Sequence, residues 1–326
     1  MEAEIDILTN ILRDLRFREV LHYAGYFASG WGIHSPTAGN PVFHHIVEGS
    51  CFFKTAEMQA SIQLNEGDLV VLPHGHAHTI YDQSEQLSLS TEVLLSQAQA
   101  LGERRIMLGE GEVQTRTICG IFYVDPSIHI PVWQACPAFI HVRREDTVRF
   151  PWFTAALTCL TEEANSSVFG APLMATKAAE MVFLLALRVY LSTASSNAHG
   201  WLCAARDPQI GKAIALMHNQ FAEPWTVATL GAQVGMSRSS FAAKFQKLTG
   251  QSPMRYLTER RLQVAARLIR ERQDSVYEIA YQVGYLSFVG FYNAFKQHYH
   301  VPPGKYRHQM NSNRQSNTEC LDTLRN

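Results

Sequence analysis

The chain has 326 residues, of which 46% are hydrophobic and 17% are charged, and its net charge at pH 7 is −1. This length exceeds what one compact core usually organises, so two domains with connecting helices are expected. The composition is typical of a soluble globular protein. The longest apolar run, Met181 to Leu187, is too short to span a bilayer, so no membrane partner is expected.

The first fifteen residues carry acidic side chains where a secretory signal would be basic, which favours a cytoplasmic location. The cysteines are far apart and form no CxxC or CxxH pair, which argues against a disulfide framework or a zinc finger. We therefore expect reduced, buried thiols. The six cysteines are Cys51, Cys119, Cys136, Cys159, Cys203 and Cys320.

Charge is distributed unevenly along the chain. Residues 1 to 205 hold 12 Lys and Arg against 21 Asp and Glu, a net charge of −9. Residues 206 to 310 hold 14 against 6, a net charge of +8. A basic segment joined to an acidic one is typical of a polyanion-binding module attached to a domain with another task.

Hydrophobic periodicity divides the first two thirds of the chain into three parts. Apolar residues at helical spacing predict a short amphipathic helix from Ile5 to Leu15. Short alternating runs punctuated by Gly, Pro and Asn predict antiparallel β structure from Tyr23 to about His141. The helical period returns from Phe150 to Thr193 as two helices separated at Gly170 to Pro172, and Ser192 to Asn197 is a predicted hinge.

Residues 206 to 310 contain an internal repeat with an offset of 50. The repeated patterns are Phe241-x3-Phe245-x7-Pro253-x-Arg255-Tyr256 and Phe291-x3-Phe295-x7-Pro303-x-Lys305-Tyr306. A second pair lies upstream with an offset of 49, and its members are Leu230-Gly231-x2-Val234-Gly235 and Ile279-Ala280-x2-Val283-Gly284. One fold unit used twice accounts for both pairs.

Each unit has the sequence features of a helix-turn-helix. An apolar helix ends at a glycine that can adopt the left-handed conformation, and a serine, Ser237 or Ser287, then caps a second helix. An apolar residue before each cap is expected to form a hydrophobic staple with a phenylalanine four residues after the cap. The predicted staple pairs are Met236 with Phe241 and Leu286 with Phe291.

One helix of about 19 residues is predicted between the two units, from Pro253 to Glu271. At 1.5 Å per residue it is about 28 Å long, which suits two recognition helices placed near one DNA turn apart, about 34 Å. Its inward-facing residues are predicted to be Leu257, Leu262, Ala265, Leu268 and Ile269.

These motifs, with the final stretch Val301-Pro302-Pro303-Gly304-Lys305-Tyr306-Arg307, resemble the DNA-binding domain of AraC/XylS-type transcription regulators. The resemblance implies double-stranded DNA as a partner. It implies that the residues at or near the groove are Arg238, Ser239, Ala242, Ala243, Lys244, Phe288, Val289, Tyr292, Asn293 and Lys296. Candidate phosphate contacts, about half of them expected to be plain surface charges, are Arg206, Lys212, Lys247, Arg260, Arg261, Lys305 and Arg307.

The recognition positions depart from the family pattern. Family members often carry Arg or Gln at the positions of Ala242, Ala243 and Val289, and only Arg238 and Asn293 have the forked donors that read guanine or adenine edges. Methyl contacts to thymine, or readout of DNA shape, must supply part of the specificity.

The first half resembles a cupin barrel, a small antiparallel β-barrel that holds a metal or a small ligand. Gly67-x5-Pro73-x-Gly75-x2-His78 is similar to the second cupin signature, and Val47-Glu48-Gly49 is similar to the turn that closes the first. The stretches Gly30-Trp31-Gly32-Ile33 and Phe43-His44 resemble the cupin-type sensor domains of one branch of AraC/XylS regulators.

A metal site is weakened by one departure, because Val42 stands where cupin enzymes carry a Glu ligand. We expect no cofactor and no catalytic residue. A residual metal site remains an alternative, since His44 and Glu48 share a strand face by period two and His78 can join them. His74 and His76 are expected to line a turn.

The preferred use of the barrel is to bind a small-molecule effector. The pocket wall is predicted to contain Trp31, Phe43, His44, Phe53 and His78, all of which can equally be core residues. The helices from Trp152 to Leu191 would relay the state of the barrel, and they would pack either between two subunits or against the barrel. A homodimer is expected from the resemblance.

The predicted fold is α+β and multidomain. It comprises a cupin-like effector domain (1–149), a helical linker and dimerisation region (150–205), an all-α tandem helix-turn-helix domain (206–307) and a disordered tail (308–326). The favoured function is an effector-responsive transcription regulator, which contacts RNA polymerase if it is an activator. The alternatives are a metal-dependent cupin enzyme, an oxygenase or isomerase, fused to a DNA-binding module, and an architectural DNA-binding protein with a dimerising barrel.

Overall fold

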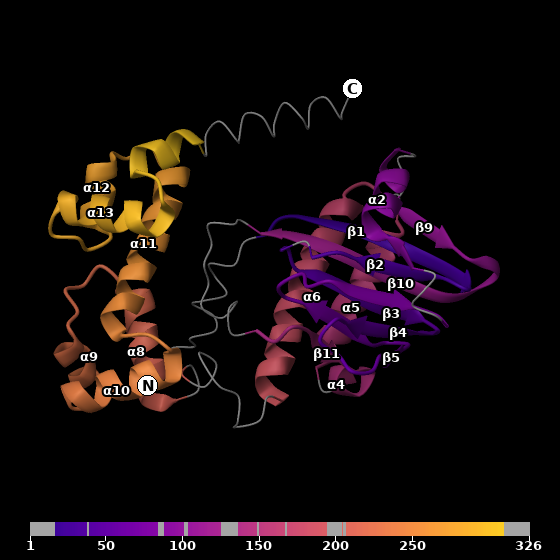
Figure 1. The fold of residues 1–326 in the computed structure, drawn as a ribbon, viewed down its shortest axis with the longest axis horizontal. Coiled ribbons are helices and arrows are strands. Elements are labelled where there is room, and N and C mark those ends of the chain that lie inside the picture. Colours follow the sequence, from indigo (N-terminus) through magenta and orange to yellow (C-terminus); the bar gives the residue numbers. More distant parts are fainter. Residues whose placement is uncertain are drawn as a thin grey trace. The chain divides into compact units, whose positions relative to one another are not determined.

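The computed structural model describes residues 17–37, 39–83, 88–100, 104–124, 136–148, 150–166, 168–193, 204 and 207–309. The described residues up to 193 form one compact unit, and those from 204 onward form a second (Figure 1). The predicted helix from Ile5 to Leu15, the end of the predicted hinge and most of the predicted tail lie outside the described residues. Within the described part of the chain, no helix is long and apolar enough to cross a membrane.

The first unit contains two β-sheets. The six-stranded sheet has the order β11 (Ile140–Val142), β6 (Leu69–Leu72), β3 (Val42–Glu48), β10 (Glu110–Val124), β1 (Phe17–Ser29) and β9 (Arg105–Leu108). The five-stranded sheet has the order β5 (Ile62–Asn65), β4 (Ser50–Thr55), β7 (His78–Tyr81), β2 (Gly32–Ser35) and β8 (Ser88–Ser90). Buried side chains of both sheets, among them Phe27, Ile46, Phe53 and Ile80, form one hydrophobic cluster.

The predicted cupin-like β domain is confirmed, with one difference: its strands form two mixed sheets and not one closed antiparallel barrel. The sheets are mixed, because β9 pairs with β1 and β8 pairs with β2 in parallel. The helix α2 (Thr91–Ala100) connects β8 of the five-stranded sheet to β9 of the six-stranded sheet. The sequence analysis did not predict this helix.

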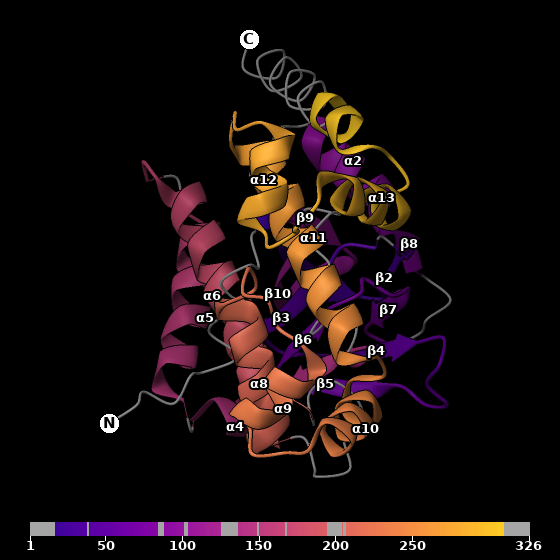
Figure 2. The same ribbon diagram turned by 90° about the vertical axis from the view of Figure 1, so that its left-hand side faces the viewer.

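Helices cover the outer face of the six-stranded sheet (Figure 2). They are the short α4 (Arg144–Val148), α5 (Pro151–Ala164) and α6 (Ala171–Thr193), so the two helices predicted from 150 to 193 are confirmed. The ring of Phe183 in α6 lies 5.1 Å from that of Phe122 in β10. The Tyr26 hydroxyl in β1 donates a 2.8 Å hydrogen bond to the side-chain oxygen of Asn165, just after α5. One face of this helical pair therefore packs against the β domain.

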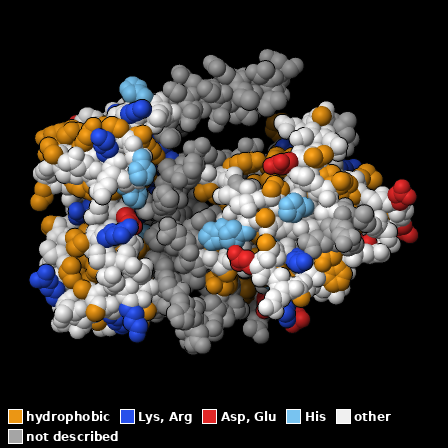
Figure 3. Space-filling model, viewed as in Figure 1, with side chains coloured by type: hydrophobic (Ala, Val, Ile, Leu, Met, Phe, Trp, Pro, Cys, Tyr) orange, Lys and Arg blue, Asp and Glu red, His pale blue; other side chains and the backbone are white. Residues whose placement is uncertain are grey.

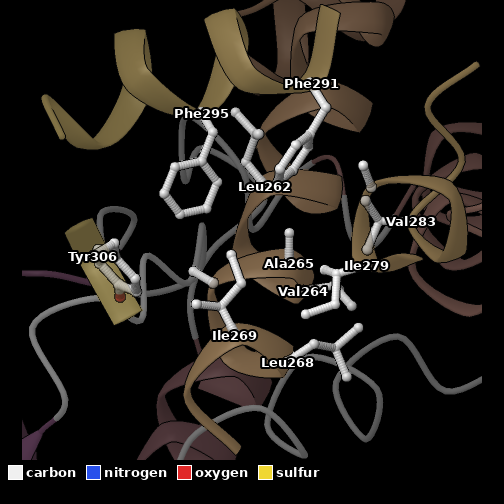
Figure 4. Close-up of a cluster of buried hydrophobic side chains, with 12 residues drawn as sticks. Leu262, Val264, Ala265, Leu268, Ile269, Ile279, Val283, Phe291, Phe295 and Tyr306 are labelled. Carbon is white, nitrogen blue, oxygen red and sulfur yellow. The ribbon is translucent and has the colours of Figure 1, made fainter. Parts of the chain in front are cut away.

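The second unit consists of helices. They are α8 (Pro208–Asn219), α9 (Val227–Gln233), α10 (Arg238–Thr249), α11 (Pro253–Glu271), α12 (Val276–Gln282) and α13 (Phe288–Tyr299). The central helix α11 has the predicted bounds, and all five residues predicted to face inward are buried. Figure 4 shows how α11, α12 and α13 share a core, to which they contribute Leu262, Ala265, Ile269, Ile279, Val283, Phe291 and Phe295.

The two recognition helices end differently, although both end in the left-handed conformation. Gly250 follows α10 with φ 78°, and His300 follows α13 with φ 60°. A side chain in this region costs free energy that glycine avoids. We expect His300→Gly to raise the free energy of unfolding of the second unit by about 0.5–1 kcal/mol, measured by urea denaturation. The matched exchange Gly250→His should lower the free energy of unfolding. Two exchanges that change it in the same direction would contradict a conformational cost at these positions.

Candidate DNA interface and effector cavity

Both recognition helices begin at the predicted caps. The hydroxyl of Ser237 accepts a hydrogen bond from the Ser240 amide, and that of Ser287 accepts one from the Gly290 amide. The preceding helices end before Gly235 and Gly284, which have φ values of 68° and 85°. The tandem helix-turn-helix prediction is therefore confirmed in its local chemistry.

The turn of the second helix-turn-helix is one residue longer than that of the first helix-turn-helix. The Met236 amide donates a hydrogen bond to the Gly231 carbonyl in the first helix-turn-helix, and the Tyr285 amide donates one to the Ala280 carbonyl in the second helix-turn-helix. Tyr285 is thus the counterpart of Met236, and the extra residue before the cap is Leu286. This insertion is where the repeat offset changes from 49 to 50.

The staple predicted for Leu286 is wrong. Its side chain is 91% exposed. The ring of Tyr285 instead lies edge-on to Phe291, with ring centroids 5.4 Å apart. The extra residue has moved the apolar contact one position back along the chain.

The structure brings the predicted groove residues to the surface of α10 and α13. Six are exposed and four are half-buried. The exposed side chains are Arg238, Ser239, Ala243, Val289, Asn293 and Lys296, and the half-buried ones are Ala242, Lys244, Phe288 and Tyr292. Lys244 is already engaged, because its ammonium lies 2.7 Å from the carboxylate of Asp207, the residue that caps α8.

Three of the predicted phosphate contacts are structural instead. Arg261 donates to the carbonyls of Phe221 and Glu223, each at 2.7 Å. Arg307 donates to two further carbonyls at 3.3 and 2.6 Å. Arg260 is 9% exposed. Arg261 and Arg307 thus bind backbone carbonyls of the unit and Arg260 is buried, whereas Lys212, Lys247 and Lys305 are exposed and Arg206 lies outside the described residues.

The first unit contains a cavity of about 140 Å³, partly open to solvent, between its two sheets and α2. Its walls are mainly apolar, from residues such as Phe27, Ile33, Leu94 and Ile121. The polar groups along it come from Tyr23, Ser35, Thr37, His44, Thr91, Glu92, Thr117 and Cys119.

Only His44 of the five predicted wall residues lines this cavity. Phe43 is the next residue on β3 and points to the opposite face, where it packs on Phe122. Trp31 stacks against Phe27 with ring centroids 4.2 Å apart, and Phe53 is fully buried in the hydrophobic cluster. For these three residues the core alternative is correct. His78 does not line the cavity but contacts His44.

A chain of hydrogen bonds runs from the cavity into the protein. His78 Nδ1 lies 2.8 Å from the His76 carbonyl, which only accepts, so this nitrogen carries the proton in neutral His78. His78 Nε2 therefore accepts from His44 Nε2, 2.7 Å away. His44 Nδ1 is then the acceptor for the Cys119 thiol, whose Sγ lies at 3.0 Å. The sequence analysis treated Cys119 only as a buried thiol.

Both imidazoles are held neutral. Burial, and next the neighbouring His78, keep the pKa of His44 well below its usual value, and burial lowers the pKa of His78 to about 4. Burial raises the pKa of the Cys119 thiol to about 12. The polar end of the cavity therefore carries no charge at neutral pH.

Acidification should weaken the first unit. A histidine whose folded pKa is depressed binds its proton more readily in the unfolded chain, so its stabilisation is complete above pH 6.5 and is lost as pH falls towards 4. We expect each of His44 and His78 to contribute a slope of up to about 1.4 kcal/mol per pH unit. Urea denaturation at pH 7 and pH 5 measures it. Burial also lowers the pKa of His22 and of His45. The double variant His44→Leu, His78→Leu should therefore reduce the dependence without abolishing it, and an unchanged slope would refute this assignment.

The predicted metal set is not assembled. A β-bulge lies between Ile46, which pairs with Thr117, and Glu48, which pairs with Arg116. The bulge moves Glu48 off the face that carries His44, and its side chain, 60% exposed, pairs with Arg116. Among the described residues, no group of three or more His, Cys, Asp and Glu side chains is placed to hold a metal ion. The residues present do not fit a cupin metal centre.

Comparisons with known proteins agree with this architecture. A family model described as Cupin matches residues 6–192, more than half of the chain, and one described as Helix-turn-helix domain matches residues 230–309. An AraC-like transcription regulator from Streptomyces lividans is 28% identical over 303 residues, which are 93% of this chain and 98% of the relative. The HTH-type transcriptional regulator AlkR from Acinetobacter baylyi is 26% identical over 307 residues, 94% of this chain and 100% of the relative.

A solved structure resembles the second unit. It is the DNA-binding domain of AdpA in complex with a target DNA, which is 31% identical with a TM-score of 0.32 and covers 33% of this chain and 97% of its own. The two family models and the relatives that span nearly the whole chain show that this chain belongs to the AraC family of DNA-binding transcription regulators and carries an N-terminal cupin domain.

Proposed function

We propose that this regulator responds to a small neutral effector bound in the cavity of its cupin domain. The observation that carries the proposal is the partly open, mainly apolar cavity, in which His44 and Cys119 form an uncharged polar pair. A cavity of about 150 Å³ in an engineered protein binds benzene, so about 140 Å³ suits a molecule of roughly six to ten non-hydrogen atoms. The cavity lining in this protein includes the carboxylate of Glu92 and no Lys or Arg, so an anionic group would be desolvated there without a counter-charge, which disfavours anionic effectors.

The effector would act by population shift. Parts of the cavity wall belong to α2, through Leu94 and Leu95, and to β2, through Ile33. A ligand that favours one arrangement of these elements changes the population of the regulator's states only through differential affinity. Bound DNA would then be released or repositioned, and contact with RNA polymerase would follow if the protein activates transcription in the cytoplasm.

The protein is proposed to act as a homodimer. The helical pair α5–α6 packs one face on the β domain and exposes apolar side chains elsewhere, and a surface of this kind marks an interaction site. These exposed residues are Trp152, Val168, Phe169, Leu173, Met174 and Met181. A second copy of the chain would cover them and would supply the symmetry that paired DNA half-sites need. A monomer in sedimentation at micromolar concentration would overturn this part.

We propose no enzymatic activity and no resident metal. The outward position of Glu48 and the mutual hydrogen bond of His44 and His78 support this, as do relatives that are named transcription regulators. A stoichiometric transition metal in the purified protein that is lost with His78→Ala would favour the oxygenase or isomerase alternative.

Filling the cavity tests the effector proposal. Ile121 lines the cavity, whereas Tyr123 lies two residues along the same strand, is 37% exposed and does not line it. A library of small neutral molecules is screened by thermal shift with the full chain. We expect compounds that stabilise the protein and change its DNA affinity, that lose both effects with Ile121→Trp and that keep them with Tyr123→Trp. Binding that persists in the filled variant would place the effector elsewhere, and a library without ligands would favour the architectural alternative.

A further inference from the structure

The second helix-turn-helix exposes apolar side chains where the first does not. Leu286 is 91% exposed and Val289 is 68% exposed, and the tyrosines Tyr277 and Tyr281 of α12 are 56% and 44% exposed. Hydrophobic side chains gather over α12 and α13 in Figure 3. Proteins rarely leave neighbouring apolar side chains in water without an interaction that covers them.

The two helix-turn-helix motifs can be compared with each other, because their helices have the same arrangement and their side chains differ. The first two residues of α10 are Arg238 and Ser239, and the first two of α13 are Phe288 and Val289. Both helices have 12 residues and begin at a serine cap. The first helix-turn-helix thus offers hydrogen-bond donors at the start of its recognition helix, whereas the second offers only hydrocarbon side chains there.

Leu286 has no counterpart in the first helix-turn-helix, since it is the residue inserted in the turn of the second. It stands immediately before the cap Ser287, three residues from Val289, so both lie at the leading end of α13. Neither Leu286 nor Val289 is buried in the core that Phe291 and Phe295 form. Leu286 and Val289 therefore have no packing role in the core of the second helix-turn-helix.

Aromatic rings support this end of the helix. The ring of Phe288 lies 5.7 Å from that of Tyr277 and 6.4 Å from that of the buried Phe291. The Tyr281 hydroxyl donates to the Tyr277 hydroxyl at 3.2 Å. Phe288 is therefore anchored, and it holds the start of α13 while Leu286 and Val289 project from it.

We infer that Leu286 and Val289 form a thymine-reading face, which contacts the C5-methyl groups of thymines in the major groove. This inference rests on the DNA-binding function and assigns a specificity role to Leu286, which no motif identified. The thymine methyl is the apolar group that the major groove presents. Cytosine at the same position would present its N4 donor to hydrocarbon and leave it unpaired, which disfavours it further.

Removing the methyl group alone tests this inference. Binding sites are selected from random duplex DNA with the full chain, and each thymine of a selected site is then replaced singly by deoxyuridine, which differs from thymidine only by lacking the C5 methyl. For the unaltered protein we expect one or two positions at which deoxyuridine lowers affinity about fourfold, the effect of one buried methyl group. The double variant Leu286→Ser, Val289→Ser should bind thymine and deoxyuridine equally at those positions.

Controls separate this inference from the DNA-binding function itself. Val113 is an exposed valine of the first unit, and Val113→Ser should keep the full deoxyuridine effect. Both substituted positions are exposed, so the unfolding midpoint should not change. If unmodified sites bind but deoxyuridine is neutral at every position, or its effect survives in the double variant, the thymine-reading face is refuted and the surface belongs to a protein partner. If no DNA is selected at all, the DNA-binding function fails instead.

Discussion

Replacing Phe291 by alanine is expected to destabilise the second helix-turn-helix strongly. Phe291 has no exposed surface and lies between Tyr285, Phe288 and Phe295, with ring centroids 5.4 to 6.4 Å away. Truncating a buried phenylalanine costs about 3–5 kcal/mol, since burial is lost and a cavity remains. A small domain has about 5–15 kcal/mol of stability in total, so a large fraction of the stability of the helical domain would be lost.

Two measurements follow this loss. Urea denaturation gives the change in the free energy of unfolding, and amide hydrogen exchange should show lost protection in α12 and α13, with protection retained in the β-sheets of the first unit. Gln297→Ala is the matched control, because Gln297 is exposed on the same helix and its truncation should change stability by less than about 0.5 kcal/mol. A loss below about 1 kcal/mol for Phe291→Ala would mean that this ring is not a core residue.

The helical unit was predictable because its signals are local. The bounds of α11, its five inward-facing residues and the caps Ser237 and Ser287 follow from periodicity and from serines placed before helices. The error in the predicted staples, at Leu286, came from aligning the two turns at their caps. Alignment at Gly235 and Gly284 would have identified the inserted residue.

The cavity was not predictable, because long-range pairing decides which strand face is enclosed. Period two separates Phe43 from His44 but does not say which of them faces the second sheet. The bulge that turns Glu48 outward depends on the register between β3 and β10, which no local pattern encodes. The same applies to Arg261 and Arg307, whose carbonyl partners lie about 40 residues away along the chain.

Arginines and lysines of the second unit should separate into two groups when affinity is measured against salt. With about six phosphates neutralised, affinity should fall about 10³-fold between 50 and 200 mM salt. Lys305 is exposed, whereas the nearby Arg307 donates to the carbonyls of Ile269 and Asp274. The slope of log affinity against log salt is negative, and Lys305→Gln should reduce its magnitude by about one while leaving the free energy of unfolding unchanged. Arg307→Gln should instead lower the free energy of unfolding by about 1–3 kcal/mol, because two partly buried carbonyls lose a charged donor, and should keep the slope. A reversed result would return Arg307 to the phosphate contacts, and a slope near zero for the unaltered protein would contradict the DNA interface itself.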